Sequence, residues 1–487
     1  MNFYIKGKVV FLPVEVKNRE WKSTLFLTHY FLKKGYHVVT GMLWHMNDYA
    51  NNNSKNCVYV GKDFFKYEAS VYSELKRNGH FIAAYDAEGL IYDNDNNYFS
   101  QSLNKETLNE VDCVIAWGKR QQVSILKFLN NEKQIFSLGN SRLDLLRKDF
   151  LINCYNQECK YILEHYGKDF ILINSNFNVI TREDYNAKET SVAVNGNQEE
   201  NNVFFDKYNI FISELFPKFL QMIKTISFAF PDRIIILRPH PAENENTWMK
   251  LLKELKNVRI EKKFSVNPWI NYAKVVIHSG CTTGIEATLM GKNVLSYQPS
   301  LTVKYPDTFP DRISKIITNE EKMIETISNI YRFNNSSTIL NQKQKELLNY
   351  YFSINEDVTC SERIVNCIDK EYKKIAKLKF STSISKRIDR YCNKKNEVNF
   401  NIEFGHIQFD ECIHDFSEIY NSQPFSYKYK IYDLSDNKFL FYNKTVGGKR
   451  IEKKGFCKNC ITDFFTLFKL FKSLLKRKVK LLFNSMK

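Results

Sequence analysis

The chain has 487 residues, 43% of them hydrophobic and 26% charged, so it is long enough for two or three globular domains. The first 19 residues lack a signal-peptide pattern, and no apolar run approaches the roughly 18 residues of a membrane span. We therefore expect a cytoplasmic protein and exclude an integral membrane protein, a secreted protein and a peptide hormone.

The net charge is +17, with 71 Lys and Arg against 54 Asp and Glu. Residues 371–487 hold 25 basic and 12 acidic residues, a net +13, which leaves 46 against 42, or +4, for residues 1–370. A charge confined to one end argues against a basic groove through the fold, so we expect no nucleic-acid partner. It favours electrostatic attachment through the C-terminal region.

Short apolar runs alternate with amphipathic segments along the first 300 residues, a pattern typical of parallel strands joined by crossover helices. We expect a polar loop over 182–202. The remaining predicted elements are strands at 9–12, 37–40, 81–85, 112–117, 170–174, 233–237, 275–278 and 293–297, and helices at 21–34, 68–77, 119–130, 206–228, 246–255 and 283–290. Two such series predict an α/β fold with two doubly wound domains facing a central cleft, over residues 1–165 and 166–370, followed by a basic extension over 371–487.

Ligands of doubly wound sheets bind at the carboxyl ends of strands, and Arg238-Pro-His240 directly follows a predicted strand. Arg238 and His240 can donate hydrogen bonds to a phosphate, and the flanking prolines restrict the backbone around His240. The alternative is an ordinary turn with an exposed histidine.

A second loop of small and hydroxyl residues joins the strand that ends at His278 to the helix that begins near Thr283. Backbone N–H groups at such a junction favour an anion. Glu286, one turn further on, could accept hydrogen bonds from a ribose or be an ordinary first-turn charge. The predicted nucleotide-binding residues are Arg238, His240, Ser279, Gly280, Thr282, Thr283 and Glu286.

In the first predicted domain, Asp86 and Glu88 follow a strand and are candidates for the general base of an inverting sugar transfer. Their spacing of two places them on opposite faces if the strand continues, so one of them would face the cleft. Glu15 and Arg19 follow the first strand and are candidates for positioning the acceptor. An acidic turn without catalytic function is the alternative.

Together these segments resemble bacterial surface-carbohydrate biosynthesis proteins, glycosyltransferases of the GT-B type with two Rossmann-like domains, used for capsule and lipopolysaccharide. The resemblance covers residues 5–330. It rests on segments 12–15, 19–20, 86–89, 139–144 and 173–177 and on the two loops of the second domain. It implies an acceptor domain over 1–165 and a nucleotide-sugar domain over 166–370.

A narrower similarity is to bacterial sialyltransferases and Kdo transferases, which share an acidic-acidic-Gly motif, a His-Pro motif and a Ser/Thr motif. This implies a CMP-activated sugar acid as donor, transferred to a surface-polysaccharide or lipid-linked acceptor, with no further cofactor. Ala87 stands where that motif has its first acidic residue. The alternatives are a UDP-sugar transferase or epimerase, a CDP-polyol phosphotransferase and a non-catalytic scaffold.

Beyond residue 463 the pattern predicts an amphipathic helix with Phe and Leu on one face and Lys on the other. Such helices lie in the interface of anionic membranes, so we expect peripheral attachment to the inner face of the cytoplasmic membrane. The pair Cys457 and Cys460, with Cys412 and His414, could ligate zinc, but no second pair with finger-like spacing exists and we expect ordinary reduced thiols and no metal.

Overall fold

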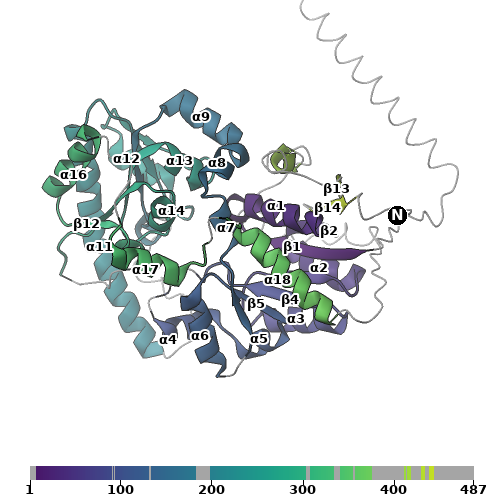
Figure 1. Cartoon of the computed structure of the whole chain (residues 1–487). Helices are drawn as coiled ribbons and strands as arrows, with labels where there is room; N and C mark the ends of the chain where they lie inside the picture. Colours follow the sequence, from purple (N-terminus) through teal and green to yellow (C-terminus); the bar gives the residue numbers. More distant parts are fainter. Residues whose placement is uncertain are drawn as a thin grey trace, which may run out of the picture.

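Two parallel β-sheets organise the chain (Figure 1). The structure, a computed structural model, describes most of the chain. The described residues are 7–89, 92, 94–130, 133–181, 198–302, 308–333, 340–354, 357–375, 411–412, 414–417, 429–433 and 438–443.

The first sheet has the strand order β13-β14-β2-β1-β3-β4-β5-β6. Strands β1 to β6 are parallel, whereas β14 pairs antiparallel with β2 and with β13. Its strands are β1 (Lys8–Val14), β2 (Tyr36–Met42), β3 (Val58–Gly61), β4 (Phe81–Tyr85), β5 (Cys113–Ala116), β6 (Ile135–Ser137), β13 (Tyr429–Asp433) and β14 (Lys438–Asn443).

Helices cover both faces of this sheet, which explains why its parallel strands are apolar on both sides. In β1, Val10 and Leu12 belong to one hydrophobic layer and Val9 and Phe11 to the other, as the alternation along a strand requires. The first layer contains α1 (Lys17–Lys33), α7 (Ser141–Asp144) and α18 (Cys360–Ile375). The second contains α2 (Leu43–Asn53), α3 (Glu68–Arg77), α4 (Asp95–Ser102), α5 (Lys105–Glu110) and α6 (Lys119–Leu129).

The second sheet is parallel throughout, with the order β12-β11-β10-β7-β8-β9. Its strands are β7 (Phe170–Asn174), β8 (Ile235–Arg238), β9 (Val258–Ile260), β10 (Ala273–His278), β11 (Asn293–Tyr297) and β12 (Lys315–Ile317). Counted from β7, this is the 3-2-1-4-5-6 order of the Rossmann fold.

Two hydrophobic layers also enclose the second sheet. One contains α10 (Asn178–Thr181), α11 (Gln198–Ala229), α12 (Glu245–Leu252) and α16 (Glu320–Arg332), and the other contains α9 (Asn156–Tyr166), α13 (Val266–Tyr272) and α14 (Thr283–Leu289). Three further helices, α8 (Lys148–Cys154), α15 (Phe309–Arg312) and α17 (Gln342–Tyr351), contribute to the hydrophobic cluster of the first domain. The predicted fold class, α/β with two Rossmann-like domains of the GT-B type, is confirmed.

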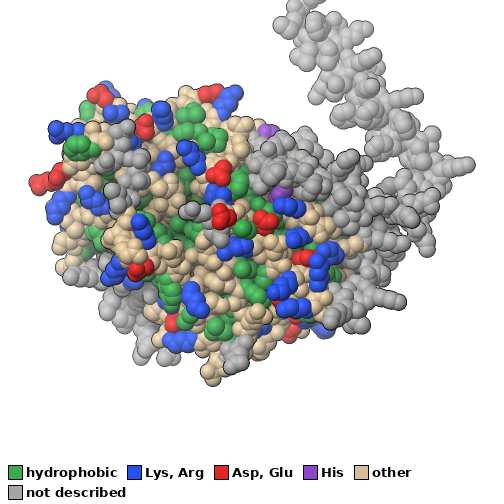
Figure 2. Space-filling model, viewed as in Figure 1, with side chains coloured by type: hydrophobic (Ala, Val, Ile, Leu, Met, Phe, Trp, Pro, Cys, Tyr) green, Lys and Arg blue, Asp and Glu red, His purple; other side chains and the backbone are tan. Residues whose placement is uncertain are grey.

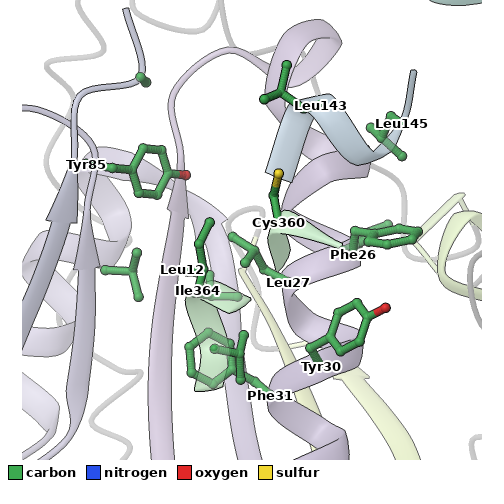
Figure 3. Close-up of a cluster of buried hydrophobic side chains, with 14 of the residues drawn as sticks. Leu12, Phe26, Leu27, Tyr30, Phe31, Tyr85, Leu143, Leu145, Cys360 and Ile364 are labelled. Carbon is green, nitrogen blue, oxygen red and sulfur yellow. The ribbon is translucent and has the colours of Figure 1, made fainter. Parts of the chain in front are cut away.

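After the second sheet the chain returns to the first domain. Helix α18 lies across it beside α1 and α7 (Figure 1). In Figure 3 side chains from β1, β4, α1, α7 and α18 meet in one buried cluster, in which Leu12, Phe31 and Ile364 are labelled. Since α18 packs against the first domain, we propose that the second domain ends before Cys360, and not at residue 370.

The predicted basic extension is also part of the first domain in those segments that the structure describes. Strand β14 pairs with β2, with Leu440 opposite Val39, and Asp415 accepts a hydrogen bond from Trp21 Nε1 at 2.9 Å. The predicted amphipathic helix beyond residue 463 and the pair Cys457 and Cys460 lie outside the described residues. Among the helices described, none is both long enough and apolar enough to span a bilayer.

Asp144, which is 2% exposed, fixes the start of α18 to α7. Its carboxylate accepts hydrogen bonds from the N–H groups of Cys360 (2.7 Å) and Ser361 (2.8 Å) and from the Ser361 hydroxyl (2.6 Å). A carboxylate at a helix N-terminus satisfies N–H groups that have no partner within the helix and interacts favourably with the helix dipole.

We predict that Asp144→Ala lowers the free energy of unfolding by about 2–4 kcal/mol, because three buried donors lose their acceptor. Chemical denaturation of the purified protein measures this loss. Asp149→Ala is the matched control, because its exposed carboxylate has only a 3.4 Å ion pair with Arg147, worth about 0–1 kcal/mol. Equal losses in the two variants would show that Asp144 does not anchor α18.

Candidate functional site

Charged side chains gather where β1, β3 and β4 end. The strand order reverses between β1 and β3, because β2 lies on one side of β1 and the later strands on the other. In doubly wound sheets this switch point opens the crevice in which ligands bind. Glu15 and Arg19 follow β1, Lys62 follows β3, and Asp86 and Glu88 follow β4.

A buried ion pair fixes the geometry of this edge. Lys62 and Glu20 are 4% and 2% exposed, and Lys62 Nζ lies 3.3 Å from Glu20 Oε2 and donates to the Tyr85 hydroxyl at 2.7 Å. Burial disfavours the charge of Lys62, but Tyr85 and Glu20 outweigh it and raise its pKa. Burial likewise disfavours the charge of Glu20, but Lys62 and Arg19 outweigh it and lower its pKa. Both groups therefore stay charged at neutral pH.

Arg19 connects the acidic residues of this edge. Its guanidinium forms an ion pair with Glu88, donates to Glu20 Oε1 at 2.9 Å and lies 3.9 Å from Glu15 Oε2. The Glu15 N–H in turn donates to Glu20 Oε2 at 3.1 Å. The two predicted acceptor-binding residues, Glu15 and Arg19, are thus brought together with Glu88.

The two candidate bases have different environments. Asp86 is 1% exposed, accepts the Glu88 N–H at 3.0 Å, and has its pKa raised to about 7 by burial. The Glu88 side chain is 58% exposed, so it alone of the two is accessible to a substrate. Ala87 is 4% exposed and its N–H donates to Lys62 O at 2.8 Å. The side chain at position 87 therefore points into the core, where an acidic residue could not serve as an exposed base.

In the second domain His240 follows β8 on a loop held by a buried carboxylate. Glu243, 3% exposed, accepts hydrogen bonds from the N–H groups of His240 (3.2 Å) and Phe177 (2.8 Å) and from Trp248 Nε1 (2.6 Å). The imidazole Nδ1 of His240 lies 3.2 Å from the Ala242 N–H and accepts from it. Because Nδ1 is an acceptor, neutral His240 carries its proton on Nε2, which can donate to a ligand.

The Arg238 guanidinium, predicted to contact a phosphate, has backbone partners in the structure. Its guanidinium is buried and donates to the backbone carbonyls of Glu261 (3.2 Å), Lys263 (2.8 Å) and Phe264 (2.9 Å). Burial lowers its pKa to about 9. These bonds tie the end of β8 to the loop after β9, so Arg238 supports the His240 loop and we leave it out of the proposed phosphate site.

The hydroxyl loop after β10 is placed as predicted, at the carboxyl end of its strand, but two of its hydroxyls have protein partners. Ser279 Oγ donates to Tyr297 O at 3.0 Å, and Thr283 Oγ1 donates to Cys281 Sγ at 3.2 Å. Gly280 has a φ of +76°, a conformation that favours glycine. Thr282 is exposed and precedes α14. Phosphate binding by this loop stays a prediction.

Glu286 has an ionic partner in the other half of the chain. Its carboxylate lies 3.3 Å from Arg142 Nη2, and both side chains are mostly buried. Burial raises the pKa of Glu286, whereas Arg142 and Arg19 of the first domain lower it. A carboxylate in this ion pair joins the two domains, which gives Glu286 a structural role besides the predicted ribose contact.

The carboxyl ends of the two sheets face each other. His240 has its pKa lowered by burial, and the negative charge of Glu88 is among the influences that oppose this shift. Glu88 follows β4 of the first sheet and His240 follows β8 of the second. The two are therefore within electrostatic range across the domain boundary.

The sequence analysis did not predict Lys62 or Glu243 as site residues, and it did not predict β3, the strand that Lys62 follows. The run Val58-Tyr59-Val60 followed by Gly61-Lys62-Asp63 was a usable signal, because β-branched and aromatic residues before a turn predict a strand. Nothing local marks Glu243, whose partners Ser175 and Phe177 are more than 60 residues away in sequence.

Among the described residues, no group of three or more His, Cys, Asp or Glu side chains could hold a metal ion. On the face of the molecule shown in Figure 2, Lys and Arg side chains are interspersed with Asp and Glu and form no continuous basic strip.

No protein-family model matches the chain, and no curated protein matches it. Among solved structures, a putative UDP-N-acetylglucosamine 2-epimerase from Listeria monocytogenes is 13% identical, with 76% of this chain and 98% of that chain covered and a TM-score of 0.46. The wall teichoic acid polymerase TagF (H548A) is 12% identical, with 76% and 90% covered and a TM-score of 0.48. UDP-GlcNAc 2-epimerase from Neisseria meningitidis bound to UDP-GlcNAc is 11% identical, with 74% and 100% covered and a TM-score of 0.45. These similarities concern the fold alone.

The raised pKa of Asp86 predicts a pH-dependent stability. The folded protein holds this proton up to about pH 7, whereas the unfolded chain releases it near the ordinary value of 3.8. The stabilisation is therefore complete below pH 3.8 and is lost as the pH rises through 7. Asp86→Asn has an uncharged side chain of nearly the same shape at every pH. The free energy of unfolding of this variant minus that of the natural protein should therefore be greater at pH 8.5 than at pH 4.5 by roughly 2–4 kcal/mol. Urea denaturation at both pH values measures this difference, and a constant difference would contradict it.

Proposed function

We propose that this chain is a nucleotide-sugar-dependent glycosyltransferase. The observation that carries the proposal is the position of Glu88 and His240, which follow β4 of the first sheet and β8 of the second and so lie at the carboxyl ends of those strands. Glu88 is exposed and oriented by Arg19, while His240 stands on a loop held by Glu243. The donor would lie on the second domain and the acceptor on the first.

In the proposed reaction Glu88 takes the proton of an acceptor hydroxyl while that oxygen bonds to the anomeric carbon. The bond from this carbon to the phosphate oxygen breaks, and its electron pair leaves with the nucleotide. Burial lowers the pKa of His240, which therefore donates as neutral imidazole from Nε2 to a phosphate oxygen. Thr282 and the N–H groups near it would support the same phosphate.

The charges of the first domain favour an uncharged sugar over the predicted CMP-activated sugar acid. Glu15, Asp63 and Glu88 lie at this edge beside the buried pair of Glu20 and Lys62. Arg19 is shared between Glu15, Glu20 and Glu88, so a sugar carboxylate placed here would be repelled by the remaining negative charge. A UDP-sugar avoids this cost at its transferred group. The solved structures of similar fold include enzymes bound to UDP-GlcNAc or soaked with CDPG, so UDP-sugars and CDP-polyols belong in the donor screen beside CMP-sugars. A surface-polysaccharide or lipid-linked acceptor and membrane attachment remain part of the proposal.

Calorimetric titration with UDP, CDP and CMP, followed by assays of nucleotide release from UDP-GlcNAc, CDP-glycerol and CMP-sialic acid, tests the proposal. We expect nucleotide binding that weakens in His240→Ala. If none of the three nucleotides binds, the chain is a scaffold and the proposal is wrong. If a UDP-sugar is converted to its epimer without any transfer, the nucleotide site is right and the transferase assignment is wrong.

With the accepted donor, we predict that Glu88→Gln lowers kcat by about 100-fold or more, because an amide cannot accept the acceptor proton. The matched control is Glu74→Gln, which replaces another exposed glutamate of the first domain, whose carboxylate lies 3.8 Å from Arg77 and accepts a hydrogen bond from Asn51 at 3.3 Å. Asp86→Asn should keep most of the activity, because the buried Asp86 side chain does not reach a substrate. Full activity in Glu88→Gln would remove Glu88 from the mechanism.

A further inference from the structure

Three aromatic side chains form a strip at the same edge of the first sheet. Trp44 lies at the start of α2, two residues after the end of β2. Phe65 and Tyr67 lie on the loop between β3 and α3. The ring centroids of Phe65 and Tyr67 are 5.6 Å apart with planes at 30°, and those of Trp44 and Tyr67 are 6.5 Å apart. Trp44 and Tyr67 are 47% and 48% exposed, which is unusual for large aromatic residues of a well-packed domain.

The strip is rigid and lies against carboxylates. Asp63 accepts hydrogen bonds from the Tyr67 hydroxyl at 2.9 Å and from the Phe65 N–H at 3.0 Å, which fixes the Tyr67 ring. Glu15 is close enough to influence both Tyr67 and Asp63 electrostatically. A fixed ring beside a hydrogen-bond acceptor offers an apolar face and a polar group together.

Glu68 is a further carboxyl group near Tyr67, but a buried one. It is 2% exposed, and neither of its carboxyl oxygens has a hydrogen-bond partner among the described residues. Burial raises its pKa to about 8, with Asp63 and Glu15 contributing, so the carboxyl is mostly protonated at neutral pH. Because it is closed off from solvent, Glu68 does not reach a ligand, and the accessible carboxylate beside the strip is that of Glu15, whose side chain is 43% exposed.

We propose that Trp44, Phe65 and Tyr67, with the exposed carboxylate of Glu15, form an acceptor subsite that binds the rings of an uncharged oligosaccharide. Sugar rings present C–H groups that pack on aromatic faces, and their hydroxyls donate to carboxylates. The surplus of carboxylates argues against a phosphorylated or uronic-acid chain at this place.

The subsite leads toward the proposed catalytic residue. Glu15 borders the strip and lies 3.9 Å from Arg19, and Arg19 forms the ion pair with Glu88. A glycan on the strip could therefore extend one hydroxyl toward Glu88. In this respect the inference rests on the proposed function, because it names the acceptor class of the same site.

The fluorescence of Trp44 offers a direct measurement of binding. The chain has five tryptophans, and Trp21, Trp117, Trp248 and Trp269 are at most 3% exposed, so neutral acrylamide should quench mainly Trp44. The probes are maltotetraose, cellotetraose and chitotetraose, with tetragalacturonate as an anionic tetrasaccharide. We expect at least one neutral probe to protect Trp44 from acrylamide and tetragalacturonate not to. Protection by tetragalacturonate alone, or by none of the four, would overturn the proposal.

For the neutral probe that binds, calorimetry should show about 3- to 10-fold weaker binding in Trp44→Ala and in Tyr67→Ala. Phe228→Ala is the matched control, because it removes a 75% exposed aromatic side chain from α11 in the second domain. Unchanged binding in both variants would disprove the subsite. Circular dichroism spectra and thermal unfolding confirm that each variant folds.

Titration of the same variants with nucleotides separates this proposal from the proposed function. Trp44→Ala should bind nucleotide as the natural protein does, since the donor belongs to the second domain. If glycan protects Trp44 but no nucleotide binds, the subsite stands and the transferase proposal falls. If nucleotide binds but no neutral glycan does, the subsite alone is wrong.

Discussion

The buried ion pair between Lys62 and Glu20 is the interaction on which the arrangement of the first domain depends. Removing two charges from water is costly, and the pair persists because each partner has further contacts: Tyr85 for Lys62, and Arg19 and the Glu15 N–H for Glu20. The network links the start of α1 to the ends of β3 and β4. It therefore sets where Arg19 lies, and Arg19 in turn orients Glu88.

The two domains are joined by polar contacts and by a shared hydrophobic cluster. Arg142 of α7 pairs with Glu286 of α14, and two residues later Asp144 holds the start of α18. Ile285 and Phe309 of the second domain belong to the same hydrophobic cluster as the inner face of the first sheet. The segment 139–144, which the sequence offered only as part of a resemblance, thus has a physical explanation: Arg142 connects the two domains, and Asp144 holds α18 on the first. A rearrangement of the domains would have to break the pair between Arg142 and Glu286.

The strands and helices that could be predicted from the sequence are those that a local pattern of apolar residues marks. Strands such as β4 and β7 are buried along their whole length and mostly apolar, because both faces of a parallel sheet are covered, and they were predicted with the bounds that the structure shows. The pairing of β14 with β2 joins residues about 400 positions apart, and nothing local in either segment indicates it. For the same reason the return of α18 to the first domain could not be predicted from local patterns.

At the candidate site, too, the position of a residue at a strand end could be predicted, but the groups that its side chain contacts could not. The strand-end rule placed Glu88, His240 and Thr282 at carboxyl edges, but it could not show what each side chain touches. Arg238 is the clearest case, because its three acceptors are backbone carbonyls of a loop more than 20 residues away. The choice between Asp86 and Glu88 likewise needed their burial, which spacing alone does not decide.

In the proposed reaction the charges of the first domain act on the acceptor, and those of the second domain act on the leaving phosphate. The first domain gathers carboxylates around the acceptor, which favours loss of a proton to Glu88 and disfavours a second anion there. The negative charge then develops on the leaving phosphate, which lies on the other domain beside the His240 donor. Because the charge moves away from the acidic edge as the bond breaks, the repulsion that excludes an anionic sugar acid from the first domain also favours departure of the nucleotide. One distribution of charge would therefore account for both the choice of an uncharged substrate and the direction of transfer.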